Sequence, residues 1–132
     1  MKTIQLLNFD QKGDERGNLI VVESHGNIPF TIQRAFYMLK TQNEVARGCH
    51  ANRNSEFVLI NIQGSVIIDT DDGNHKQSFT LDQADQGLYL PNMVWKEMHH
   101  FSEDSILLVL SNQAYDEHEY IRDYPQFLKE TQ

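Results

Sequence analysis

Short apolar runs separated by turn signals limit what this chain can fold into. The clearest runs are residues 57–62 (FVLINI), 65–70 (SVIIDT) and 105–111 (SILLVLS), which are rich in branched aliphatic side chains and too short for typical helices. Residues 71–74 (DDGN) predict a hairpin turn, because Asp-Gly tolerates the positive φ that such turns need. The other predicted strands are 4–9, 18–23, 31–39, 75–81 and 87–95, the last broken by a turn at Pro91.

Many short strands with almost no helical periodicity predict an all-β sandwich or barrel. The best fit is the double-sheet jelly roll of the cupins, a double-stranded β-helix whose tapered interior opens at one mouth. An immunoglobulin-like sandwich is the alternative, and the Gly87-to-Pro91 spacing weighs against it. Residues 115–130 are charged and aromatic and contain Pro125, so we expect a short helical or irregular C-terminal tail packed on the barrel.

The length of 132 residues predicts one domain over residues 1–132, with enough chain to bury a core. No apolar run approaches the roughly 20 residues of a membrane helix, and residues 1–5 lack the apolar core of a signal peptide. Cys49 is the single cysteine, so we expect no intrachain disulfide and a cytoplasmic location. The formal charge of −8 argues against a nucleic-acid partner, although a local arginine cluster can still bind a small anion.

Residues 47–65 contain the most informative combination of chemistry and structure. A polar segment, 47–52 (RGCHAN), is predicted to form a turn that leads into the buried strand 57–62, and a loop over 40–46 precedes it. Reactive side chains at the mouth of a rigid strand are how a β scaffold holds a small-molecule site. We therefore expect the site at this mouth, with Arg47 and His50 in it.

Many cupins hold a divalent metal with a His-x-His pair and a glutamate on one strand and a histidine on a later strand. The corresponding positions here are His50, Asn52, Glu56 and Lys96. Lysine donates hydrogen bonds and repels a cation, and asparagine is a weak ligand for transition metals. We therefore expect neither a metal nor another cofactor, since zinc sites usually take at least three protein ligands.

The chain resembles the sugar nucleotide 3,4-ketoisomerases of the WxcM-like cupin group, which act on dTDP-4-dehydro-6-deoxy-D-glucose. The most specific matching segments are RGCHA (47–51) and YIRDY (120–124). Others lie along nearly the whole chain: DERGNL (14–19), IPFTIQR (28–34), GLY (87–89), VW (94–95), EMH (97–99) and FS (101–102). The resemblance implies a metal-free cupin homodimer that interconverts 4-keto and 3-keto sugars linked to dTDP. Two histidines transfer protons in the family signature RG-x-HAH, and this chain has His50 for the first and Asn52 for the second. The family often has a histidine after the tryptophan, where this chain has Lys96.

Moving a ketone from C4 to C3 requires removal of a proton from C3 and delivery of one to C4 through an enediol. His50 is the candidate general base, because histidine titrates near the working pH. Tyr37 and Arg47 are candidate donors to the enediolate oxygen, and Lys96 is a candidate cation beside it. Either His50 carries the proton between the two carbons, or Lys96 or a water replaces the missing histidine, and the sequence favours neither.

Five residues are predicted to bind the substrate. Arg16 and Arg122 are the candidates for the diphosphate, because guanidinium groups bind phosphate with two parallel hydrogen bonds. Trp95 offers an aromatic surface for thymine or the sugar. Asn52 is expected to bind a sugar hydroxyl, and Glu97 either does the same or orients the histidine.

The two departures from the family signature keep other functions open. One is a nucleotide-sugar-binding cupin without catalysis, and another is a related sugar-nucleotide epimerase. A metal-dependent cupin dioxygenase is disfavoured by the broken ligand set.

Overall fold

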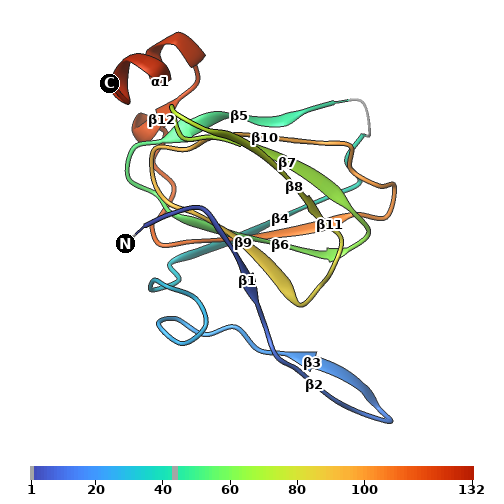
Figure 1. Ribbon diagram of the computed structural model, residues 1–132. Helices are drawn as coiled ribbons and strands as arrows, with labels where there is room; N and C mark the ends of the chain where they lie inside the picture. The colour runs from blue at the N-terminus through green and yellow to red at the C-terminus, as the bar shows by residue number, and fades with distance from the viewer. Residues whose placement is uncertain (1, 43–44) are drawn as a thin grey trace.

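Two five-stranded antiparallel sheets face each other in the computed structural model, which describes residues 2–42 and 45–132 (Figure 1). The first sheet contains, in spatial order, β1 (Gln5–Asn8), β9 (Gln86–Leu90), β6 (Phe57–Gln63), β11 (Ile106–Ser111) and β4 (Arg34–Leu39). The second contains β12 (Tyr120–Ile121), β5 (Arg47–Asn52), β10 (Trp95–His99), β7 (Val66–Asp71) and β8 (Lys76–Leu81). Consecutive strands from β4 to β7, and again from β8 to β12, alternate between the two sheets, which confirms the predicted all-β jelly roll.

The core lies between the two sheets, where every second side chain of a strand points inward. Val66 and Ile68 of β7 belong to the same buried cluster as Leu107 and Val109 of β11. The branched residues that predicted these strands therefore also supply their packing.

Each sheet has an outer cover as well. Ile28 and Phe30, from residues 21–33, pack with Val58 and Ile60 on the outer side of β6. The outer side of the second sheet is covered by α1 (Tyr124–Glu130), whose fully buried Phe127 packs with Ala51 and Trp95. Strands such as β6 and β10 are thus buried on both faces.

The C-terminal tail contains the predicted short helix. A 3-10 turn, η1 (Glu117–Glu119), precedes β12 and then α1. Pro125 lies in the first turn of α1, where a missing N–H costs no intrahelical bond, and the Asp123 side chain accepts a hydrogen bond from the backbone N–H of Gln126. Pro125 thus helps to begin the short helix of this tail.

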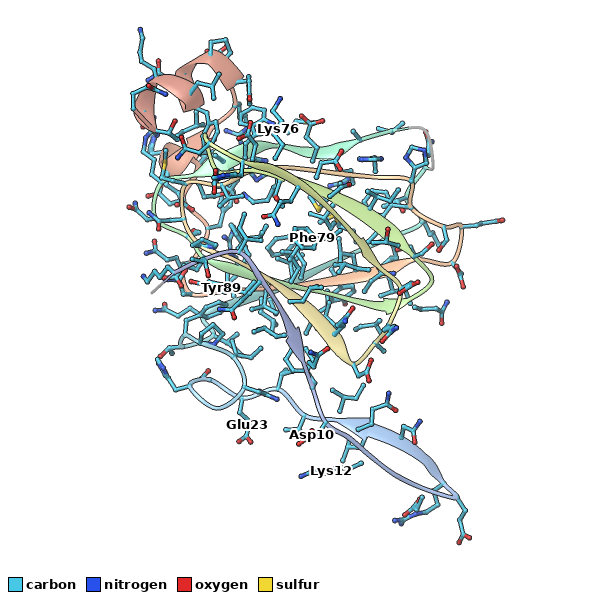
Figure 2. The ribbon with its side chains drawn as sticks, viewed as in Figure 1. Asp10, Lys12, Glu23, Lys76, Phe79 and Tyr89 are labelled. Atoms are coloured by element: carbon cyan, nitrogen blue, oxygen red, sulfur yellow. The ribbon has the colours of Figure 1, made fainter. Side chains whose placement is uncertain are left out.

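A hairpin of β2 (Gln11–Asp14) and β3 (Gly17–Ile20) stands apart from both sheets (Figure 1). Figure 2 shows Asp10 and Lys12 on this arm, away from the barrel. Only residues 15 and 16 connect its two strands. The predicted strand 18–23 correspondingly starts one residue earlier and ends at residue 20.

Three further boundaries differ from prediction. Residues 47–52 form the strand β5 rather than a turn, since His50 lines an interior cavity and Asn52 is buried. The predicted strand 31–39 begins at residue 34, and the predicted strand 87–95 is β9 alone, with β10 starting at Trp95. Of the predicted loop 40–46, residues 43 and 44 lie outside the described residues. No helix in the described ranges is both long and apolar enough to cross a membrane.

Candidate active site

A β-bulge in β5 shapes the site. His50 lies opposite Lys96 of β10, whereas the next residue of β10, Glu97, lies opposite Gly48, so Cys49 is the extra residue. Gly48 and Cys49 have φ angles of 83° and 57°. A Cβ on Gly48 would also lie 3.1 Å from the backbone oxygen of Lys96. The Arg-Gly-x-His pattern thus has a local physical reason, because the bulge needs glycine and turns His50 inward.

His50 presents one ring nitrogen to the site. Its Nδ1 lies 3.0 Å from the carbonyl oxygen of Gly48, and because a carbonyl only accepts, Nδ1 carries the proton in the neutral ring. Nε2 therefore holds the free lone pair. Burial, and after it the charge of Lys96, lowers the pKa of His50 to about 4. The imidazole is consequently neutral and able to accept a proton at physiological pH.

Lys96, Asn52 and Glu119 form a buried chain beside His50. Lys96 Nζ donates to Asn52 Oδ1 over 3.0 Å, and Asn52 Nδ2 donates to Glu119 Oε2 over 2.9 Å. Only 4% of Lys96 and 1% of Asn52 is exposed. Burial lowers the pKa of Lys96 to about 7, with Glu119 opposing that change. The lysine can thus be an acid or a base near neutral pH.

Glu119 is held as a carboxylate at the end of this chain. Burial alone would raise its pKa, but hydrogen bonds from the Ser55 hydroxyl and from the backbone N–H groups of Asn54 and Ser55 keep that pKa below its usual value. Because an ionised carboxylate only accepts hydrogen bonds, Glu119 determines which end of the Asn52 amide faces it.

A ring of aromatic and cationic side chains surrounds His50. Tyr120 meets the histidine ring edge-on with centroids 4.8 Å apart, and the Arg122 guanidinium lies 4.8 Å above the Tyr120 ring. Arg34 of β4 lies 5.7 Å from the ring of Tyr115, which in turn packs on Tyr120. Within the described part of the chain, the buried Nε and Nη2 atoms of Arg34 have no hydrogen-bond partner. Such atoms are rare in folded proteins and suit an anionic ligand.

The cavity at this site has a volume of about 130 Å³. Arg47, Gly48, His50, Lys96 and Tyr120 line it, with apolar side chains from β4, β6 and β11 on the remaining walls. Polar groups on a largely apolar wall are typical of small-molecule sites. The arrangement can take a proton from a carbon acid and place a cation beside the developing oxygen charge.

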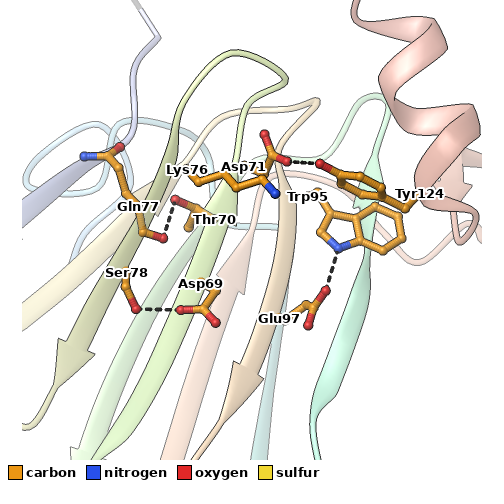
Figure 3. A pocket seen from close by; sticks show the side chains of 9 residues that line it. All are labelled: Asp69, Thr70, Asp71, Lys76, Gln77, Ser78, Trp95, Glu97 and Tyr124. Atoms are coloured by element: carbon orange, nitrogen blue, oxygen red, sulfur yellow. Dashed lines mark hydrogen bonds between the residues drawn. The ribbon is translucent and has the colours of Figure 1, made fainter.

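A larger groove of about 490 Å³ lies on the outer side of the second sheet, and Figure 3 shows it. Trp95 and Glu97 line this groove (Figure 3). Lys96, between them on β10, lines the inner cavity instead. The Trp95 Nε1–H donates to Glu97 Oε2 over 3.0 Å, and Trp95 packs on Phe127 of α1. The carboxylates of this groove already accept hydrogen bonds from neighbouring hydroxyl and indole groups, so we assign the chemistry to the smaller inner cavity.

The structure brings together five of the nine residues predicted for the site: His50, Arg47, Lys96, Asn52 and Arg122. Trp95 and Glu97 lie across the sheet from the cavity. Tyr37 is 67% exposed on the outer face of β4, and Arg16 pairs with Asp14 at the tip of the β2–β3 hairpin.

Sequence reasoning missed three residues of the site: Arg34, Glu119 and Tyr120. Arg34 could have been predicted, because it shares one face of β4 with Phe36 and Met38. A charged residue on an otherwise apolar face indicates a functional site. The segment YIRDY was a signal for Tyr120, which lines the cavity. Tyr120 and Glu119 come beside β5 through the pairing of β12 with β5, which no local pattern reveals.

The positions that correspond to cupin metal ligands have other partners. Glu56 accepts hydrogen bonds from Tyr89 and from Lys2, and Lys96 and Asn52 bind each other. Within the ranges 2–42 and 45–132, no group of three or more His, Cys, Asp or Glu residues could hold a metal ion.

Comparison with known proteins identifies the family. The family described as FdtA (WxcM-like, C-terminal) matches residues 2–132. This chain belongs to the FdtA family. That result confirms the resemblance carried by the RGCHA and YIRDY segments.

Relatives in the FdtA family have stated activities. The TDP-4-oxo-6-deoxy-α-D-glucose-3,4-oxoisomerase of Aneurinibacillus thermoaerophilus is 44% identical over 125 residues, covering 95% of this chain and 90% of that protein. A 3,4-ketoisomerase from Helicobacter canadensis superimposes with a TM-score of 0.95 at 41% identity, over 99% of this chain and 98% of the other.

A third FdtA-family relative has been solved with a ligand. A mutant of the 3,4-ketoisomerase QdtA from Thermoanaerobacterium thermosaccharolyticum, in complex with TDP-4-keto-6-deoxyglucose, has a TM-score of 0.94 at 34% identity. The match covers 97% of this chain and 93% of that one. The family is thus represented by isomerases of nucleotide-linked keto-sugars.

Proposed function

We propose that this protein is an isomerase that converts dTDP-4-dehydro-6-deoxy-D-glucose to a dTDP-3-dehydro-6-deoxyhexose through an enediol. The observation that carries the proposal is the neutral His50 ring, which lines the cavity with Nε2 unprotonated, in a chain of the FdtA family. Membership of the FdtA family indicates the class of substrate, and the unprotonated Nε2 of His50 is a base for the carbon-bound proton. The product belongs to the synthesis of deoxyamino sugars, as the family resemblance implies.

His50 begins the reaction by taking the proton from C3. Its low pKa keeps Nε2 unprotonated, and the hydrogen bond to Gly48 holds the ring in one orientation. Arg47, which lines the cavity, is the proposed donor to the oxygen on which negative charge develops. The apolar walls exclude water from the enediolate.

Arg34 and Arg122 are the proposed diphosphate ligands, with Tyr115 and Tyr120 as aromatic surfaces between them. Support comes from the partnerless buried nitrogens of Arg34 and from the stacking of Arg122 on Tyr120. Guanidinium groups bind phosphate oxygens in pairs, and their affinity survives the net negative charge of the chain because the attraction is local.

The protein is also proposed to form a homodimer. Support comes from apolar side chains left exposed on the outer face of the first sheet, including Tyr37, Leu39 and Ile62, and from Leu19 on the projecting hairpin. Exposed apolar side chains gathered on one face of a sheet commonly mark an interface. Sedimentation at micromolar concentration should give twice the chain mass of 15.4 kDa, and a single-chain mass would contradict the proposal.

The cytoplasm is the proposed compartment. The exposed thiol of Cys49 supports it, since free exposed cysteines persist in reducing surroundings.

Isomerisation is tested by incubating the protein with dTDP-4-dehydro-6-deoxyglucose in D₂O and following the sugar by NMR. We expect a 3-keto sugar, with turnover abolished in His50→Asn and unchanged in His75→Asn. His75 is a suitable control because it lies at the β7–β8 turn, outside the inner cavity. Deuterium uptake at C3 without a 3-keto product would point to an epimerase, and saturable binding without either change would leave a binding protein. Both results would overturn the proposal.

A further inference from the structure

The amide of Asn52 has only one orientation that satisfies both of its neighbours. Glu119 accepts hydrogen bonds and cannot donate them as a carboxylate, so the NH₂ end of the amide must face it. The amide oxygen therefore faces Lys96, at 3.0 Å from Nζ. Glu119 thereby fixes the position of the Lys96 amine, although the two residues lie in different elements.

The rest of the Lys96 amine is free to act in the cavity. One of its N–H groups donates to Asn52, and the centroid of the apolar Phe57 ring lies 4.9 Å from Nζ. Lys96 is the direct cross-strand neighbour of His50, and both line the same cavity. An ammonium has two further donors, and a neutral amine has a lone pair in place of one proton.

We infer that Lys96 moves protons between the two sugar oxygens of the isomerisation, and that Glu119, acting through Asn52, is its positioning residue. This inference rests on the proposed isomerase function. It assigns the carbon-bound proton to His50 and the oxygen-bound protons to Lys96, which separates two roles that the sequence left open.

The two halves of the reaction balance with these groups alone. First, the C3–H bond breaks as His50 Nε2 takes the proton, its electron pair forms the C3=C4 bond, and the C4 oxygen takes a proton from the Lys96 ammonium. The enediol is then deprotonated at the C3 oxygen by the Lys96 amine, while C4 takes the proton from the His50 imidazolium. Both side chains return to their initial states.

The charged surroundings of Lys96 suit this exchange. Burial lowers its pKa to about 7, and Glu119 of η1 raises it. His50 of β5 is the titratable neighbour on one side. The charge of Arg122, the residue after β12, helps to lower the pKa of that histidine. The neighbour on the other side is Thr70 of β7, which carries no charge, and Phe57 is apolar.

The pH dependence of kcat/KM for the 4-keto substrate should be bell-shaped. The free enzyme needs neutral His50 and protonated Lys96, so activity should rise through about pH 4 and fall through about pH 7. In Glu119→Gln the loss of negative charge should lower the pKa of Lys96. The upper limb of the profile, where activity falls near pH 7, should therefore move down by about one pH unit. A purely structural Glu119 would lower stability without moving that limb.

Lys96 is tested with three variants in the NMR assay. Lys96→Met should lower kcat about 1000-fold with little change in dTDP affinity, because proton transfer alone is lost. Lys96→Ala should recover activity with added ethylamine, and Lys76→Met, on the outer groove, should behave as wild type. Retained dTDP binding shows that each variant is folded.

The results separate this inference from the proposed function. A wild-type protein that makes no 3-keto sugar would overturn the isomerase itself. An active wild type with unchanged kcat and an unchanged upper limb in Lys96→Met would overturn only the role of Lys96. An upper limb that stays in place in Glu119→Gln would overturn the positioning role.

Discussion

The Nδ1 atom of His50 donates its proton to the carbonyl oxygen of Gly48, two residues earlier in the same strand, over 3.0 Å. This short contact depends on the bulge at Cys49, which turns the strand so that carbonyl and ring meet. One backbone irregularity therefore selects the tautomer, aims the ring and leaves Nε2 free. The following expectations depend on this geometry and on the groups around it.

Gly48→Ala should damage stability and activity together. The added Cβ would lie 3.0 Å from Met98 Cε and 3.1 Å from the Lys96 carbonyl oxygen, at a φ of 83°. We expect a loss of about 1–3 kcal/mol in the free energy of unfolding and a marked fall in kcat. Thermal unfolding and the NMR assay measure these two effects. Gly26→Ala is the control, because its nearest neighbour is 3.4 Å away, and an equal loss there would remove the special role of Gly48.

Stability should fall as the solution becomes acidic between pH 6.5 and about pH 4. The pKa of His50 is about 4 in the folded protein and 6.5 in the unfolded chain, so the unfolded chain binds more protons in this window. The contribution of His50 is present above pH 6.5 and is lost as the pH falls. Denaturant midpoints of wild type and His50→Gln, measured across the window, isolate it. Parallel curves for the two proteins would contradict the assignment.

Arg34→Met should weaken dTDP binding about tenfold or more, because it removes a charged pair of donors beside Phe36 and Phe57 of the cavity wall. Isothermal titration with dTDP measures the change directly. Arg53→Met is the matched control, since Arg53 pairs with Glu130 on the tail. Affinity that is equal in both variants would show that the buried nitrogens of Arg34 serve another purpose.

Trp95→Phe should lower stability and leave substrate kinetics nearly unchanged. The ring packs under α1 against Phe127, and its Nε1–H bond to Glu97 would be lost at a cost of about 1 kcal/mol. Thermal unfolding should register this loss, whereas KM should stay within about twofold, well below the roughly tenfold cost of a lost ligand hydrogen bond. A large rise in KM would instead favour the sequence-based prediction that Trp95 binds the substrate.

The strands predicted most accurately are those whose side chains are apolar on both faces. Residues 57–62 lie in β6 and residues 106–111 form β11, because branched residues there pack between the two sheets or under residues 21–33. The strand β5 was mistaken for a turn because its inward residues are polar. His50 lines a largely apolar cavity and Asn52 is buried, so polarity alone misled the prediction.

The face on which Trp95 lies could not be predicted either. Both sides of β10 are buried, one by the barrel interior and the other by α1, so alternation does not distinguish inward from outward residues. Lys96 was predicted for the site, but its partnership with Glu119 depends on η1 returning to β5 from far along the chain. Such long-range pairings follow from topology, which a single sequence does not reveal.

The bulge also exposes a cysteine that can be labelled. It places the side chain of Cys49, the chain's single thiol, on the outer surface while its neighbour His50 points inward. A fluorophore attached there would sit on the back of the cavity wall, one residue from the proton-transfer group. Its emission should report ligand entry in real time without touching any residue that the chemistry uses.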